Sequence, residues 1–214
     1  MARPSAKRRQ KKVQRKAAKR KSKRQGRTSP PKGRRAQLRA TSDWRLHECL
    51  LTKAWQDTAE ITQMLVARRS PGGQIAVGAF MVDLGCMGIK AAFGTVLNSE
   101  GEYEELRDEV CSRQDMIEAD VNLVAKIVRE SIAYANPLGF RPDPGYRDAM
   151  LVLGDADPDA CKEPIPLGKD GKPLFISGPD DKVNLIIAKL TRKLGPDGFN
   201  YVIPLEGEQD TIEE

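Results

Sequence analysis

The stretch "ITQMLVARRSPGGQIAVGAFMVD", residues 61–83, decides the fold of this chain. Two apolar runs, partly β-branched, flank the Pro- and Gly-containing segment "SPGG" at residues 70–73. This pattern predicts an antiparallel β-hairpin, because Pro and Gly favour the chain reversal between two strands. The second run is apolar at both alternating positions from Ile75 to Val82, so we expect both of its faces to be covered.

The segments on either side of the hairpin predict further strands and two main helices. A strand is expected from Arg45 to Leu51, and short strands at 173–177 and within "FNYVIPL". Apolar residues at intervals of three and four predict amphipathic helices within "RQDMIEADVNLVAKIVRESIAYANPLG" and "SGPDDKVNLIIAKLTRKLGPDG". We expect Asp115 with Glu118 to cap the first and Ser177 to cap the second. A shorter helix is expected in "DPGYRDAMLVLG".

These elements together define the expected fold class and domain organisation. A hairpin followed by helices and scattered short strands predicts an α+β domain, with a mostly antiparallel sheet and two main packed helices. We place this domain at residues 43–205. A disordered basic tail at 1–42 would precede it, and an acidic tail at 206–214 would follow it.

The charge distribution supports this division. The first 40 residues contain 18 Lys or Arg and no Asp or Glu. The other 18 basic residues and all 30 acidic residues follow, so the remainder carries a net charge of −12. The basic segment has too few apolar side chains to offset the conformational entropy lost on folding, and we therefore expect it to be disordered.

Several phrases of the predicted domain together resemble the motifs of one known family. The phrases "GAFMVDLGCMGIKAAF", "ANPLGFRPDPGY" and "GKDGKPLFISGPDD" resemble an uncharacterised bacterial family with G-x-F-x-V-D, C-x-G-x-K, PLGF-x-P and GKDGKP…GP-x-D motifs. The resemblance extends from about Trp44 to Tyr201 and leaves out the basic tail. It implies that this part is one domain, and it implies no particular activity.

The basic tail predicts binding to nucleic acid. Each Lys or Arg near a phosphate releases condensed counterions, which gives strong and salt-dependent attraction. The tail has no Phe, Tyr or Trp for base stacking, so phosphate contacts should dominate. Its composition resembles that of the basic arms of ribosomal proteins, which favours RNA over DNA and suggests ribosomal proteins as neighbours. The expected contact residues are Lys7, Arg8, Arg9, Lys11, Lys12, Arg15, Lys16, Lys19, Arg20, Lys21, Lys23, Arg24, Arg34 and Arg35.

Our first hypothesis is therefore an RNA-associated, non-catalytic protein, attached to the ribosome or its precursors by the tail. A different hypothesis is a protein-interaction domain whose tail is only a localisation signal. The longest strongly apolar run is too short to cross a bilayer, and the N-terminal residues lack the apolar region of a secretory signal. We expect no membrane association and a cytoplasmic location, or a nuclear one in a eukaryotic source.

A third hypothesis, from another class, is a metal-dependent hydrolase or nuclease that the tail concentrates on its substrate. Asp83 would be its active-site acid, with Glu48, Asp143 or Asp180 as partners. Each acid also has a structural interpretation. Asp83 starts the segment "DLG", where its carboxylate could bind backbone amides of a turn. Asp180 would lie in the first turn of a predicted helix, where negative charge complements the helix dipole.

The sequence predicts no metal site and no cofactor. His47 is the only histidine, and the four cysteines are separated by 37, 25 and 50 residues. Structural zinc modules require much shorter Cys and His spacings. We therefore expect Cys49, Cys86, Cys111 and Cys161 to be reduced thiols.

Overall fold

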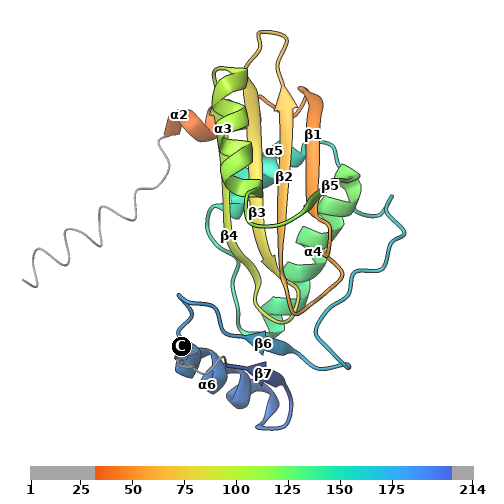
Figure 1. The fold of residues 1–214 in the computed structure, drawn as a ribbon, viewed down its shortest axis with the longest axis vertical. Helices are drawn as coiled ribbons and strands as arrows, with labels where there is room; N and C mark the ends of the chain where they lie inside the picture. The colour runs from red at the N-terminus through yellow and green to blue at the C-terminus, as the bar shows by residue number, and fades with distance from the viewer. Residues whose placement is uncertain (1–31, 204–214) are drawn as a thin grey trace, which may run out of the picture. The chain divides into compact units, whose positions relative to one another are not determined.

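The computed structural model describes residues 32–203 (Figure 1). The chain divides into two compact units, Met1–Ala36 and Gln37–Glu214. The described residues of the first unit are the opening residues of helix α2, Lys32–Arg39. All strands and the other helices belong to the second unit.

The centre of the second unit is an antiparallel sheet of five strands in the order β4-β3-β2-β1-β5. Its strands are β1 (Arg45–Thr52), β2 (Ile61–Arg69), β3 (Ile75–Asp83), β4 (Gly88–Leu97) and β5 (Met116–Glu118). The predicted hairpin is confirmed, because β2 and β3 pair antiparallel along their full length, from Ile61 opposite Asp83 to Arg69 opposite Ile75.

Helices cover both faces of this sheet, as the two-sided apolar pattern of residues 75–82 requires. The helices are α3 (Glu100–Cys111), α4 (Val121–Leu138) and α5 (Tyr146–Leu153). Figure 1 shows α3 in front of the sheet and α4 and α5 behind it. Leu51, Met64 and Phe80 face α4 and α5 in one core cluster, whereas Leu65 and Val77 face α3 in another. The predicted α+β class is confirmed.

Two glycines let α5 lie directly on the sheet backbone. Gly78 of β3 and Gly94 of β4 are cross-strand partners. A Cβ atom at Gly94 would lie 2.6 Å from the carbonyl carbon of Asp148, and one at Gly78 would lie 2.7 Å from the carbonyl oxygen of Ala149. These distances are shorter than a side chain allows, so the close contact between α5 and the sheet requires glycine at both positions.

A buried arginine holds the C-terminal end of α5. The guanidinium of Arg68 donates to the carbonyl oxygens of Val152 (2.8 Å), Leu153 (2.7 Å) and Trp44 (2.9 Å). It also donates to the exposed carboxylate of Asp155 at 3.1 Å. The last carbonyls of a helix have no partner within the helix, so Arg68 satisfies them and joins α5 to β2 and to the start of β1.

The C-terminal part adds a small second sheet and one helix to the end of α4. Strands β6 (Leu174–Ile176) and β7 (Asn200–Val202) pair in parallel, and helix α6 (Val183–Leu194) connects them. Their apolar side chains form a separate cluster with those of α4. Its fully buried members include Phe175, Leu190 and Cys86. The helices α4 and α6 are the two that the sequence predicted most clearly, and both are confirmed.

Several local predictions were wrong. Residues 116–118 form β5 instead of a helix start, and α4 begins at Val121, where the carboxylate of Asp120 accepts the N–H of Asn122 at 2.8 Å. Ser177 does not cap α6, whose N-cap position is Lys182. Helix α3 was not predicted.

The folded domain also begins before the predicted residue 43. Residues 32–39, placed in the tail by the sequence, form α2, and the side chain of Leu38 is fully buried in the core. The compact second unit starts at Gln37. The predictions for residues 1–31 and 206–214 concern segments outside the described residues.

The glycine pair gives the first testable prediction. We expect Gly94→Ala to lower the free energy of unfolding by about 1–3 kcal/mol, because the new methyl group meets backbone atoms that cannot rotate away. Urea unfolding followed by circular dichroism measures the change. The matched control is Gly101→Ala in α3, where a Cβ meets nothing within 4 Å. Its helix propensity should raise stability by up to about 1 kcal/mol. Equal destabilisation by both substitutions would contradict the account.

Candidate functional site

Asp83, the acid that the hydrolase hypothesis depends on, ends β3 at the turn that leads to β4. Its side chain is buried, with 7% of the residue exposed. Carboxylate oxygen Oδ1 accepts the backbone N–H of Cys86 at 2.8 Å and that of Met87 at 3.4 Å. These bonds close the turn, in the way the structural interpretation of "DLG" anticipated.

The same turn binds the C-terminal part of the chain. The carbonyl of Leu84 accepts the N–H of Gly168 at 2.9 Å, and the carbonyl of Gly85 accepts the N–H of Leu174 at 3.0 Å. The hydroxyl of Thr58 donates to the carbonyl of Gly168 at 2.8 Å. Asp83 therefore shapes the loop on which β6 is anchored.

Burial also determines the protonation of Asp83. Desolvation of the carboxylate raises its pKa above the ordinary aspartate value. The N–H bonds from Cys86 and Met87 and the charge of Lys90 oppose this effect and offset only part of it. Acids with a shifted pKa are common at functional sites, but buried structural carboxylates have a raised pKa as well. The contacts around Asp83 therefore have to distinguish a catalytic role from a structural one.

A pocket of about 350 Å³ adjoins Asp83. Its lining includes Lys90, Gln114 and Glu60. Lys90 is committed to an ion pair, because its Nζ lies 2.7 Å from Oδ2 of Asp181, and both side chains are largely buried. The same Oδ2 accepts the N–H of Gly178 at 2.9 Å. The pocket therefore combines a buried carboxyl with an already neutralised lysine.

Glu48, the second candidate acid, takes part in a different interaction on β1. Arg107 of α3 donates to it twice, from Nε at 2.7 Å and from a terminal nitrogen at 3.0 Å, and the hydroxyl of Tyr103 donates to it as well. Burial raises the pKa of Glu48, but the hydrogen bonds from Arg107 and Tyr103 outweigh burial, and the net pKa is lowered. Glu48 fastens α3 to the sheet and stays ionised at neutral pH.

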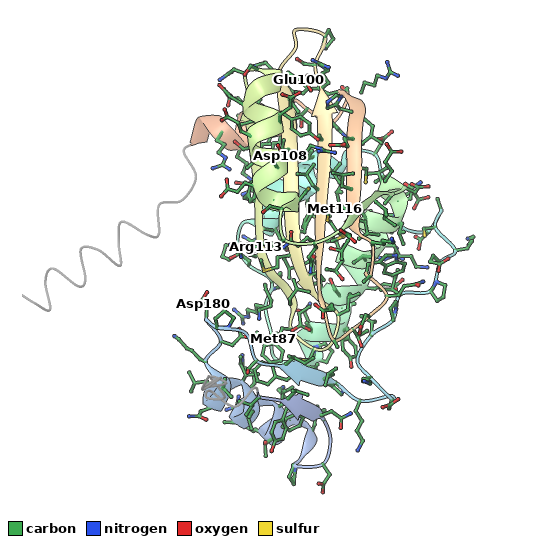
Figure 2. All side chains as sticks on the ribbon, in the orientation of Figure 1. Met87, Glu100, Asp108, Arg113, Met116 and Asp180 are labelled. Carbon is green, nitrogen blue, oxygen red and sulfur yellow. The ribbon has the colours of Figure 1, made fainter. Side chains whose placement is uncertain are left out.

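The remaining candidate acids are Asp143 and Asp180. Asp143 accepts the N–H of Gly145 at 2.8 Å within its own turn. Asp180 is exposed in the loop before α6 (Figure 2). The prediction that Asp180 lies in the first turn of the helix was wrong, because α6 begins only at Val183, after the loop that Lys90 holds through Asp181.

Within residues 32–203 the structure contains no group of three or more His, Cys, Asp or Glu side chains placed to hold a metal ion. The acids that the hydrolase hypothesis combined thus do not form a group of that size. Nε2 of His47 lies 3.2 Å from a carboxylate oxygen of Glu100. Cys49, Cys86, Cys111 and Cys161 are free thiols, and burial raises the pKa of Cys49 to about 12, which makes its thiolate rare.

The predicted nucleic-acid contacts fall mostly outside the described residues. Arg34 and Arg35 lie in α2 and are half-buried. The other twelve precede residue 32. Residues 37–203 contain 19 Lys or Arg and 25 Asp or Glu, so this part of the second unit is acidic. Its acids concentrate on α3, where Glu102, Glu104, Glu105, Asp108 and Glu109 are all exposed.

Sequence reasoning missed Tyr103, Arg107 and Lys90. A signal for the first two exists in "SEGE", residues 99–102, where Ser99 accepts the N–H of Glu102 and Glu102 accepts the N–H of Asn98. Ser99 and Glu102 have the S-x-x-E spacing of a capping box, and this spacing would have predicted α3 with Tyr103 and Arg107 one turn apart. Nothing near Lys90 in the sequence indicates a pairing with Asp181, 91 residues away.

Comparison of the chain with models of protein families, with curated proteins and with solved structures finds no match. The family resemblance of the three sequence phrases stays a prediction. Among the residues that the structure describes, no helix has the length and apolar character needed to span a membrane.

The Glu48 interaction predicts a pH-dependent loss of stability on substitution. A carboxyl with a lowered pKa stabilises the fold above its unfolded pKa, and this contribution disappears as the pH falls through the folded value. We expect Glu48→Gln to reduce the free energy of unfolding by about 1–3 kcal/mol at pH 7. The reduction should shrink towards pH 3. Urea titrations at both pH values measure it, with the exposed Glu104→Gln as control, and a pH-independent difference would disprove the assignment.

Asp83 gives a second prediction at this site. Asp83→Ala leaves the N–H groups of Cys86 and Met87 unpaired and should cost about 1–3 kcal/mol of stability. Asp83→Asn keeps an acceptor without a buried charge, so its stability at pH 7 should equal or exceed that of the wild type. A raised native pKa means that the wild type loses stability as the pH rises from the ordinary carboxyl pKa to the raised one. The Asn variant should lack this loss in a pH series of urea titrations. Equal destabilisation by Asn and Ala would refute the turn-closing role.

Proposed function

We propose that this protein is an RNA-associated, non-catalytic protein that its polybasic N-terminal segment anchors to the ribosome or to ribosomal precursors. The observation that carries the proposal is the density of unopposed charge: 12 of the 21 residues from 5 to 25 are Lys or Arg, and none is acidic. Such a segment suits a polyanion, because each neutralised phosphate releases counterions.

The composition of the segment supports contacts to phosphates over contacts to bases. It contains no aromatic residue on which a base could stack. We expect high affinity, little sequence preference and a preference for RNA over DNA. A cytoplasmic location, or a nuclear one in a eukaryotic source, agrees with this function.

The acidic second unit supports a division of labour. Phosphates repel a surface with more Asp and Glu than Lys and Arg, so nucleic acid should approach through the N-terminal segment. The candidate catalytic acids support the non-catalytic part of the proposal, because Asp83 closes a turn and Glu48 binds Arg107 and Tyr103. No observation favours the hydrolase or the pure localisation signal over this function.

The proposal predicts a steep salt dependence. If about eight phosphate contacts form, the affinity of the full chain for a labelled RNA hairpin should fall about 10³–10⁵-fold between 50 and 200 mM salt. Fluorescence anisotropy with this RNA, and with DNA of the same sequence, measures the salt slope and the preference between the two. Co-sedimentation with ribosomal particles tests the proposed location.

The variants for this test change charge within the full chain. Replacing the twelve Lys and Arg residues from Lys7 to Arg24 with Gln should abolish RNA binding. The matched control replaces every Arg of that stretch with Lys, which preserves the charge and should preserve most of the affinity. Retention of full affinity by the Gln variant would overturn the proposal, and equal affinity for DNA would remove its preference for RNA.

A further inference from the structure

A groove on the front face of the sheet combines an apolar hollow with charged side chains at its edge. Its volume is about 260 Å³. Met81 of β3 and Phe93 of β4 lie on its floor, and Leu106 and Val110 of α3 form its wall. These four side chains are only half-buried, so the apolar core is open to solvent here.

The groove exists because α3 is shorter than the strands beneath it. The helix ends at Cys111, and Figure 2 shows Arg113 just beyond this end, over the middle of the sheet. Gln63, Met81 and Ala91 are aligned across β2, β3 and β4 by the strand register, and all three line the groove. The row of side chains past the end of α3 therefore has no helix over it.

Gln63 supplies a polar group that lacks a partner. Its side-chain oxygen Oε1 is buried, and it accepts no hydrogen bond from any described residue. A buried acceptor without a donor is unfavourable. A ligand that brings an N–H or O–H group into the groove would recover this free energy, so Gln63 indicates a polar contact beside the apolar floor.

Acidic side chains lie along the helix that forms the wall of the groove. Glu109 lines it directly, and Glu105 and Glu102 lie on the same side of α3, because residues at intervals of three, four and seven share a helix face. All three are exposed. Arg113 at the end of the helix is the only basic residue of the lining. The wall therefore attracts Lys and Arg to the side of the groove.

We propose that this groove binds a basic segment of a partner protein, with one apolar side chain inserted between Met81, Phe93 and Leu106. Lys or Arg residues flanking this anchor would pair with Glu105 and Glu109, and a backbone N–H of the segment would donate to Gln63. Basic segments with isolated apolar residues are the kind that an acidic wall beside an apolar floor selects.

The chain's own N-terminal segment fits the groove less well than a partner does. It is basic, but residues 1–31 contain only Met1 and Val13 as larger apolar side chains and no aromatic residue. It can satisfy the charge of the wall without filling the pocket. The partner site is independent of the RNA proposal, because it uses the acidic second unit.

The test measures binding of defined peptides to the full-length protein. The probe is a fluorescein-labelled Gly-Ser peptide that carries Lys residues around one Phe and one Leu. One matched peptide replaces Phe and Leu with Ser, and the other replaces Lys with Glu. At physiological ionic strength, anisotropy should show binding of the probe and at least about tenfold weaker binding of both matched peptides.

Two variants locate the site. Glu105→Lys with Glu109→Lys reverses the wall and should weaken the probe at least about tenfold. The matched control, Glu104→Lys with Asp108→Lys, makes the same charge change about 100° around α3 from the first pair. Neither of its residues lines the groove. It should weaken the probe less than the first pair does, because it leaves the carboxylates beside the groove in place. Ala91→Trp fills the groove at an exposed position and should also remove binding. Urea unfolding verifies that each variant is folded.

Three outcomes would overturn the proposal. Equal weakening by the two charge pairs would mean a diffuse electrostatic attraction instead of a groove. Stronger probe binding after neutralisation of the Lys and Arg residues from 7 to 24 would mean that the chain's own N-terminal segment occupies the groove. A concentration-dependent dimer in sedimentation that Ala91→Trp abolishes would mean that a second copy occupies it.

Discussion

The contact between α5 and the backbone of β3 and β4 is the constraint on which the rest of the structure depends. Helices usually pack on a sheet through a layer of side chains, but here Gly78 and Gly94 remove that layer under Ala149 and Asp148. Arg68 then closes the end of α5 by binding the carbonyl oxygens of Val152 and Leu153. Helix α5 is thereby fixed in depth by the glycines and along its axis by the arginine.

Buried charged side chains at both ends of the strands are stabilised by backbone hydrogen bonds. Arg68 is largely buried, yet its nitrogens face carbonyl groups that a helix end leaves unpaired. Asp83 is buried at the opposite end of the strands, and the N–H groups of its own turn bind it. In both cases the buried charged group forms hydrogen bonds with backbone groups that have no other partner. A structural role therefore accounts for the burial of both side chains.

The elements that follow from the spacing of apolar residues along one segment were predictable. The elements that form by pairing of residues far apart in the sequence were not. The hairpin, α4 and α6 follow from apolar spacing within a single segment. Strand β5 has only three residues, and its pairing of Leu50 with Glu118 joins segments far apart in the sequence. Helix α3 escaped prediction because charged residues dominate it, although its Ser99–Glu102 capping box was readable. At the candidate site, the sequence predicted the turn-closing role of Asp83 as an alternative. The ion pairs of Lys90 with Asp181 and of Glu48 with Arg107 join distant segments, and no local sequence pattern indicates them.

The anchoring of β6 on the turn after β3 has a consequence for how the chain assembles. Leu84 and Gly85 offer their carbonyl groups to Gly168 and Leu174 only when Asp83 has drawn the turn into shape. The last quarter of the chain therefore has no carbonyl groups to pair with at this turn until the hairpin has formed. Contacts between residues this far apart in the sequence form late, because the entropy cost of closing the intervening loop comes before any stabilising contact. The C-terminal strands should consequently be the last region to fold and the first to open. The order of folding would then follow the order in which the chain is synthesised.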